Sequence, residues 1–235
     1  MFRIYIFIAV FLSGAALMSL EMAGLRLIQP EFGSDIIVYG SIISVFLGGL
    51  ALGAFTGGKL SDRKPNVAFL GVILFVAGAA TVLMPAYSDS VFTFFSPIQE
   101  GAGLSALELS LDDSGVIALY EPPDLRWVTL GVGISLFFIP SFLSGMISPY
   151  SARLLIRKLG RLGSGVGMLS ALSTAGSIVG TLGSTFFLIQ LLGTRRLIVA
   201  NGVLLIVLGV LAFAVRFMAK QQHEETAETD PAQTV

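Results

Sequence analysis

Glu21 is the residue most able to do chemistry in this sequence, because it stands inside a long apolar run. The run extends from about Ile4 to Ile28 and carries Arg26 five residues after the glutamate. A carboxylate that faces hydrocarbon is costly, so Glu21 is expected to face other helices or a water-filled cavity. In such a place it is a candidate proton site or a counter-charge for a cationic solute. The alternative is a glutamate that only fixes helix packing.

Arg26 and Asn201 complete the candidate substrate or proton site. A spacing of five residues places Glu21 and Arg26 about 140° apart around a helix, so a direct ion pair between them is unfavourable. Arg26 is expected at the membrane interface, where its long side chain can reach lipid headgroups. Asn201 lies early in another apolar run. Its amide either contacts substrate or pairs with a neighbouring helix.

Other kinds of chemistry have little support in the composition. The chain has no Cys, and its one His, His223, lies in a polar tail. Disulfides, thiol chemistry and Cys or His metal sites are therefore not expected. The net charge is −1 and no basic stripe with interleaved aromatic residues is present, so nucleic acid is not expected as a partner. The sequence predicts no metal and no cofactor.

The elements that must position these residues are membrane-spanning helices. Of the 235 residues, 54% are hydrophobic and 12% are charged, whereas soluble domains have about 25% charged residues. The apolar residues fall in runs long enough to cross roughly 30 Å of hydrocarbon. We predict an all-α polytopic membrane protein whose membrane domain, residues 1–219, has six transmembrane helices, over about 4–28, 36–60, 67–87, 128–150, 164–192 and 197–217.

Two polar segments lie outside these helices. Residues 88–127 hold seven acidic residues against one Arg, together with apolar stretches such as "LSALELSL". They are predicted to form an external loop, either as a connector or with a short amphipathic helix on the outer surface. Residues 220–235 are predicted to be a disordered cytoplasmic tail.

The basic residues predict the orientation. Lys and Arg near span ends collect on the cytoplasmic side of membrane proteins. One side would hold 10 of the 14: Arg3, Lys59, Arg63, Lys64, Arg153, Arg157, Lys158, Arg161, Arg216 and Lys220. Both termini are therefore expected in the cytoplasm, and the chain in the cell (inner or plasma) membrane as a multi-pass protein.

Small residues recur at four-residue spacing in the second and fifth spans. Gly49, Gly53 and Gly57 form one such series, and Gly176 and Gly180 form another. Such a stripe lets a second helix approach closely. It indicates tight packing inside the chain, a subunit interface, or the moving surface of a transporter.

The fourth span carries prolines, and the spans fall into two similar groups. Pro140 and Pro149 can break or kink the fourth helix, as happens where a helix lines a cavity. Spans one to three and four to six each have a Gly/Ser-rich central helix next to a basic turn. This pattern hints at a three-plus-three arrangement.

The loop after the second span carries a recognisable motif. In "GGKLSDRKPN", Gly58, Leu60, Asp62 and Arg63 resemble the cytoplasmic signature between the second and third helices of major-facilitator transporters. An aspartate beside a helix end, flanked by cations, can form a charge lock between helices. After Arg63, "KPN" replaces the glycine and basic pair of that family, so the lock is expected to be weaker or absent.

Longer stretches resemble the membrane part of the fused major-facilitator/spermidine-synthase family. They are "SGAALMSLEMAGLRLI", "FLGGLALGAFTGGKLSDR" and "IPSFLSGMISPYSARLLIRKLGRLGSGVGMLSALSTAGSIVGTLGSTFFLIQLLGTRR". This resemblance covers most of the chain and implies a six-helix module that resembles half of a major-facilitator fold. No strand–glycine-loop–helix pattern of the soluble aminopropyltransferase domain is present. We therefore expect no enzyme activity from this chain.

Two functions remain open. The first is a transporter-like module for polyamines or related small amines, which would form a homodimer to complete a twelve-helix cavity. The second is a non-transporting membrane anchor or scaffold for a separately encoded spermidine-synthase-like enzyme. Such an enzyme would dock on the basic turn formed by Arg153, Arg157, Lys158 and Arg161. The alternative role of that turn is to set topology and contact anionic lipid.

Overall fold

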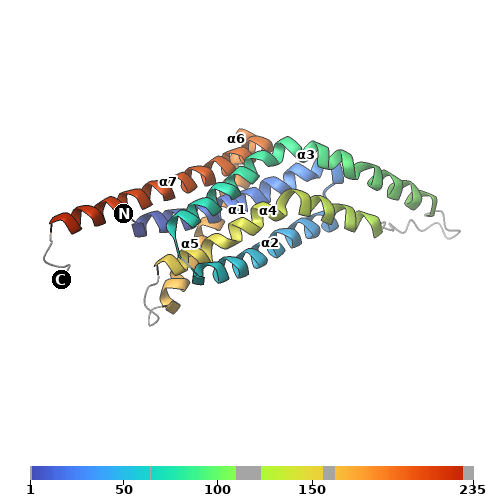
Figure 1. Ribbon diagram of the computed structural model, residues 1–235. Coiled ribbons are helices and arrows are strands. Elements are labelled where there is room, and N and C mark those ends of the chain that lie inside the picture. The colour runs from blue at the N-terminus through green and yellow to red at the C-terminus, as the bar shows by residue number, and fades with distance from the viewer. Residues whose placement is uncertain (1, 64, 110–122, 156–161, 230–235) are drawn as a thin grey trace.

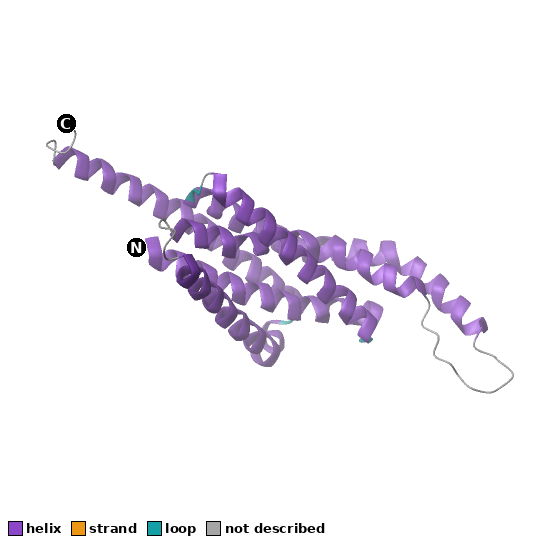
Figure 2. Cartoon of the chain, turned by 90° about the horizontal axis from the view of Figure 1, so that it is seen from below, coloured by secondary structure: helices purple, strands orange, loops and turns teal. Residues whose placement is uncertain are grey.

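The computed structural model describes residues 2–63, 65–109, 123–155 and 162–229, and gives only the backbone for 63, 97–109, 123–125, 162–164 and 218–229. Apart from short connections, these residues are helical (Figures 1 and 2). The elements are α1 (Phe2–Phe32), α2 (Ile36–Arg63), α3 (Val67–Leu109), α4 (Pro123–Leu155), α5 (Leu162–Gly183), the π-helical turn η2 (Ser184–Leu188), α6 (Ile189–Leu192) and α7 (Thr194–Thr229).

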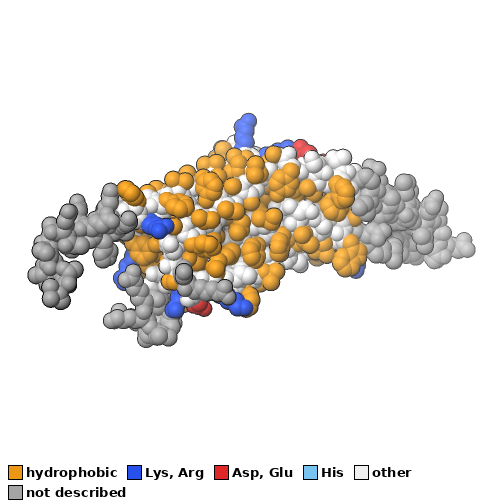
Figure 3. Space-filling model, viewed as in Figure 1, with side chains coloured by type: hydrophobic (Ala, Val, Ile, Leu, Met, Phe, Trp, Pro, Cys, Tyr) orange, Lys and Arg blue, Asp and Glu red, His pale blue; other side chains and the backbone are white. Residues whose placement is uncertain are grey.

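Six of the described helical segments are long and apolar enough to cross a membrane. They are α1, α2, α3, α4, α7, and the segment Gly165–Leu192 that joins α5, η2 and α6. Each predicted span overlaps one of them, to within one residue at the start of the fifth span. The face of the bundle drawn in Figure 3 is largely apolar between its charged ends. Exposed large apolar side chains of the described residues include Phe55, Leu191 and Phe217. The predicted all-α, six-helix, multi-pass membrane fold is therefore confirmed.

The connections α1–α2, α2–α3 and α6–α7 are short, and described residues in them encode the turns locally. Gly33 ends α1 with a φ of 81°, and Gly193 separates α6 from α7 with a φ of 76°. Both values are in the left-handed region, where only glycine avoids a steric penalty. Asn66 caps the start of α3, because its Oδ1 accepts a hydrogen bond from the Ala68 N–H at 3.0 Å.

Helices α3, α4 and α7 extend well beyond the predicted spans. Helix α3 continues to Leu109 and α4 begins at Pro123, so the segment predicted as the loop 88–127 is helical over residues 88–109. Helix α7 continues to Thr229 (Figure 1), so residues 220–229 of the tail predicted as disordered are helical. Lys, Gln, Glu and Ala favour helix, and adding a turn to an existing helix avoids the cost of nucleation. Residues 110–122 and 230–235 lie outside the described residues.

Helix packing follows a repeated pattern. Helix α2 packs mainly on α4, α5 packs mainly on α1, and α3 packs against α7. In addition, α3 contacts α4 and α7 contacts α1. The same set of helix pairs is obtained when α1 is exchanged with α4, α2 with α5, and α3 with α7.

Glycines mediate the closest of these approaches. A Cβ atom at Gly53 would overlap the carbonyl oxygen of Phe142 on α4, and Gly49 and Gly57 meet the same helix. A Cβ atom at Gly176 or Gly180 would overlap the carbonyl oxygen of Phe11 or Ala15, respectively, on α1. Both glycine stripes found in the sequence thus lie against helices of the same chain.

Helix α4 passes through Pro140 and Pro149 without interruption. Of the two alternatives predicted for these prolines, a break or a kink, the structure excludes the break. Membrane helices tolerate proline because neighbouring helices and hydroxyl side chains can satisfy the freed backbone groups. Next to Pro140, the Ser141 hydroxyl donates to the backbone carbonyl oxygen of Phe137 at 2.7 Å.

Candidate functional site

A cavity of about 330 Å³ lies among α1, α2, α4 and α5. Small polar side chains line it on three of these helices, α1, α4 and α5. Five serines contribute to it: Ser13, Ser144, Ser148, Ser170 and Ser173. Leu17, Leu50 and Leu169 provide part of the apolar wall. The cavity is therefore suited to a small solute that can hydrogen-bond to hydroxyl groups.

Proline adds a backbone acceptor to this lining. Pro149 has no N–H, so it cannot donate the helical hydrogen bond to the carbonyl oxygen four residues earlier, which belongs to Gly145. Both residues line the cavity. The combination of hydroxyl oxygens and this carbonyl favours a ligand that donates hydrogen bonds.

Glu21 lies on α1 one turn beyond this cavity. Leu17 lines the cavity, and a residue four positions later lies on the same helix face about 6 Å further along. The Glu21 side chain is half-buried. Among the described residues it makes no hydrogen bond and no ion pair. Glu21 thus lies about one helical turn from the Leu17 end of the cavity.

Asn201 belongs to a separate polar cluster. Its side-chain N–H donates to the Ser19 hydroxyl oxygen at 2.7 Å, and the Ser184 hydroxyl donates to the same oxygen at 2.6 Å. All three side chains are buried. Ser19 and Glu21 are two residues apart, about 200° around α1. The structure therefore does not bring Asn201 and Glu21 to the same face.

This cluster coincides with a change of helix type. Ser184 begins η2, where the α-helix widens to a π-helical turn. Such turns occur frequently at functional sites, because they redirect side chains and leave the helix locally less regular. The Ser19–Ser184–Asn201 cluster therefore ties α1, η2 and α7 together at this irregular point.

Arg26 lies away from both polar groups. It is exposed near the end of α1, where it lines a second pocket. The three residues expected to form a substrate or proton site, Glu21, Arg26 and Asn201, are therefore distributed over three different places.

The predicted charge-lock motif has one described ion pair. Asp62 of α2 pairs with Arg153 of α4, with 3.3 Å between Oδ1 and Nε. Both side chains are well exposed to solvent, so the pair contributes little to stability. Gly58 accepts a hydrogen bond at its carbonyl from Ser61, and the Arg63 side chain lies outside the described residues.

A second contact joins the same end of the bundle. The buried Tyr150 hydroxyl of α4 accepts a hydrogen bond from the Asn66 N–H at 3.0 Å, at the connection between α2 and α3. Of the predicted docking turn, only Arg153 is described, while Arg157, Lys158 and Arg161 lie outside the described residues. The part of the turn that can be placed is thus engaged with α2.

Sequence reasoning missed the cavity serines. Ser144 and Ser148 are four residues apart and Ser170 and Ser173 are three apart, so each pair occupies one helix face. That spacing was an available signal. It is weak, because serine hydroxyls in helices commonly bond to their own backbone, as Ser13 does with the carbonyl of Val10.

Comparison with known proteins adds no identification, because no family model, curated protein or solved structure matches this chain.

Proposed function

We propose that this chain is a membrane transporter module for polyamines or related small amines, built like half of a major-facilitator fold. The observation that carries the proposal is the serine-lined cavity with Glu21 one turn beyond it. The exchange symmetry of the helix packing supports the same proposal, because inverted three-helix repeats are a frequent plan of transporter folds.

The chemistry of the cavity matches an amine. An ammonium group donates hydrogen bonds and accepts none, and the lining supplies serine oxygens and the Gly145 carbonyl. None of the described residues that line this cavity is charged. A cation taken from water into such a place needs a compensating charge. Glu21 is the carboxylate nearest along α1 that can supply it.

A second copy of the chain would complete the cavity. Helix α2 and the α5 segment Gly165–Leu192 have the smallest buried shares of the six spans, and both border the cavity. We therefore propose a homodimer with a twelve-helix arrangement. Mass measurement in native lipid patches and in detergent tests this, and a monomer in both would contradict it.

The orientation proposed for the module follows from its charged ends. Helix α1 begins at the same end of the bundle toward which α7 runs (Figure 1). That end carries Arg3, Lys59, Arg153 and Arg216 among the exposed side chains. By the positive-inside rule, we propose that this end of the bundle faces the cytoplasm and that the chain lies in the inner or plasma membrane.

The test is amine uptake by proteoliposomes with the Glu21→Gln variant. The substitution keeps the shape of the side chain and removes its charge, so uptake of spermidine should be lost while folding is retained. Glu31→Gln is the matched control, because Glu31 is an exposed glutamate at the end of the same helix. Full uptake by Glu21→Gln across a pH series would show that Glu21 has only a packing role.

Experiments on the wild-type protein distinguish the scaffold alternative from the transporter. An anchor for a spermidine-synthase-like enzyme would transport no amine and would co-purify with that enzyme. The pairing of Arg153 with Asp62 inside the chain gives this alternative no specific support. Uptake by wild-type proteoliposomes is therefore the first measurement to make.

A further inference from the structure

A second pocket, of about 480 Å³, lies at the end of the bundle opposite the start of α1. It is formed where α1 ends, where α7 begins, and by Phe92 of α3. Three arginines line it: Arg26, Arg195 and Arg196. Neither the serine-lined cavity nor the Ser19–Ser184–Asn201 cluster shares a residue with it, so it is a separate site.

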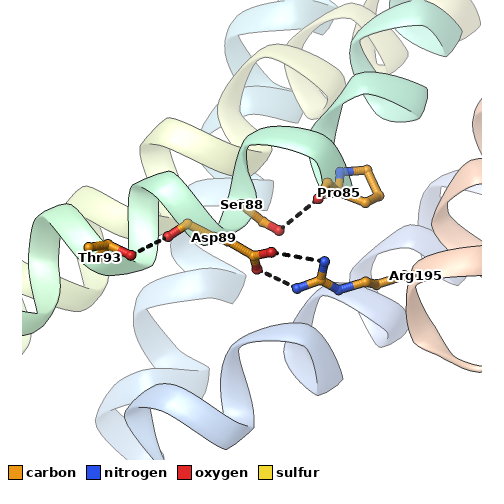
Figure 4. A network of polar contacts seen from close by, with 5 residues as sticks. All are labelled: Pro85, Ser88, Asp89, Thr93 and Arg195. Atoms are coloured by element: carbon orange, nitrogen blue, oxygen red, sulfur yellow. Dashed lines mark hydrogen bonds and ion pairs between the residues drawn. The ribbon is translucent and has the colours of Figure 1, made fainter.

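One of the arginines is already held. Both terminal nitrogens of Arg195 donate to the carboxylate of Asp89 on α3 (Figure 4), at 3.1 Å for Nη1–Oδ2 and at a short distance for Nη2–Oδ1. The neighbouring Thr93 hydroxyl donates to the Asp89 backbone carbonyl at 2.8 Å. This bidentate pair fixes the first turn of α7 against α3 and neutralises Arg195.

The other two arginines keep their charge available. Arg26 and Arg196 are exposed, and within the described part of the chain neither makes an ion pair. A guanidinium group presents several N–H donors in a plane, which suits phosphate oxygens. Glu31 also lines the pocket, so an anion must sit nearer to the two arginines than to this carboxylate.

The depth of the arginines matches that of lipid phosphate. Ile4 and Arg26 are 22 residues apart on α1, which is roughly 33 Å along a helix. Arg195 and Arg216 are 21 residues apart on α7, or roughly 32 Å. The hydrocarbon core of a bilayer is about 30 Å thick. A span with Ile4 at one boundary of this core therefore has Arg26 at the other. A span with Arg216 at one boundary has Arg195 and the adjacent Arg196 at the other.

Part of the remaining wall of the pocket is apolar, although Glu31 and Thr194 also line it. Leu27, Phe92 and Leu192 line it beside the arginines. Such a wall can contact the acyl chains of a lipid whose headgroup lies at the guanidinium groups. It would offer nothing to a fully hydrated anion.

We propose that this pocket binds a phosphate group through Arg26 and Arg196, carried either by an anionic phospholipid or by a small soluble phosphate compound. Depth and the apolar wall favour the lipid. Arg195, held by Asp89, positions the start of α7 beside the bound group. This site is independent of the proposed transport of amines.

Lipid binding measured by native mass spectrometry tests the proposal. The detergent-purified full chain is titrated with phosphatidylglycerol, and with diacylglycerol as the phosphate-free probe. The R26Q/R196Q variant should bind phosphatidylglycerol at least about tenfold more weakly, because it loses two charged groups that hydrogen-bond to the phosphate. Diacylglycerol should not bind at this site in either protein.

The matched control is R3Q/R216Q, which removes two exposed arginines from the opposite ends of the same two helices. It should keep wild-type affinity, and equal melting temperatures of the two variants would exclude misfolding as the cause of lost binding. Displacement by excess inorganic phosphate would assign the site to a soluble phosphate compound, and resistance to it would assign the site to lipid. Equal weakening in both variants, equal binding of diacylglycerol, or no binding of either phosphatidylglycerol or inorganic phosphate would overturn the proposal.

Discussion

The interfaces α2–α4 and α5–α1 occupy equivalent places in the bundle but differ in regularity. In each, glycines of one helix meet backbone atoms of the other: Gly53 meets Phe142 and Gly176 meets Phe11. Helix α2 is a regular helix from Ile36 to Arg63, whereas the α5 segment changes to the π-helical turn η2. Equivalent close packing therefore does not require equivalent helix geometry.

The two interfaces also differ in how buried polar groups are used. Between α2 and α4, the Thr129 hydroxyl donates to Ser41 at 3.0 Å. At the η2 end of α5, Ser19 accepts from both Ser184 and Asn201, so three helices share one hydroxyl oxygen. We expect α2–α4 to act as the rigid interface, and α1 with η2 to be the place where the packing rearranges.

The largest effect is expected from adding a methyl group at the glycine contacts. Gly53→Ala and Gly176→Ala should each lower the free energy of unfolding by about 1–3 kcal/mol, because the added Cβ overlaps a backbone carbonyl oxygen. Denaturation in detergent measures this. If one variant is tolerated and the other unfolds, the two interfaces are not equivalent in packing.

Gly48→Ala is the control for that prediction. Gly48 lies on the same helix as Gly53 and no atom lies within 4 Å of a Cβ built there. Alanine is a better helix former than glycine by up to about 1 kcal/mol. The control should therefore be as stable as the wild type or more stable.

A smaller effect is expected from removing matched hydroxyl groups. Ser19→Ala and Ser41→Ala each delete a buried hydrogen-bond acceptor, and each should lower stability by about 0.5–2 kcal/mol. Only Ser19→Ala should also change the rate of amine uptake, because it releases Ser184 of η2 and Asn201 of α7. An equal change in uptake for Ser41→Ala would remove the distinction between a rigid and a rearranging interface.

The smallest effect is expected from the exposed ion pair of the α2–α4 interface. Asp62→Asn removes the charge that faces Arg153. Because the pair is exposed, the free energy of unfolding should fall by less than about 1 kcal/mol, and the difference from the wild type should vanish at high salt. A larger loss that persists in salt would mean that this pair does lock α2 to α4.

Much of the fold was predictable from local sequence. The run from Ile4 to Ile28 predicted α1, and the spacing of Gly49, Gly53 and Gly57 predicted a close helix contact. These features are local, since hydrophobic length and side-chain size are written in consecutive residues. The helical extension of α3 to Leu109 was missed, because acidic residues there indicated a loop while the backbone continued an existing helix.

The sequence by itself determined that the chain is a bundle of six membrane-spanning helices with chemistry-bearing residues such as Glu21 and Asn201 inside apolar runs. Only the tertiary structure decided which helices meet, and so which residues share a site. It placed Asn201 against Ser19 and Ser184, it formed the serine-lined cavity one turn before Glu21 on α1, and it lined one pocket with both Arg26 and Arg196. The physical reason is that lipid-exposed and helix-exposed apolar faces have nearly the same composition, so the choice of partner depends on close packing between distant segments.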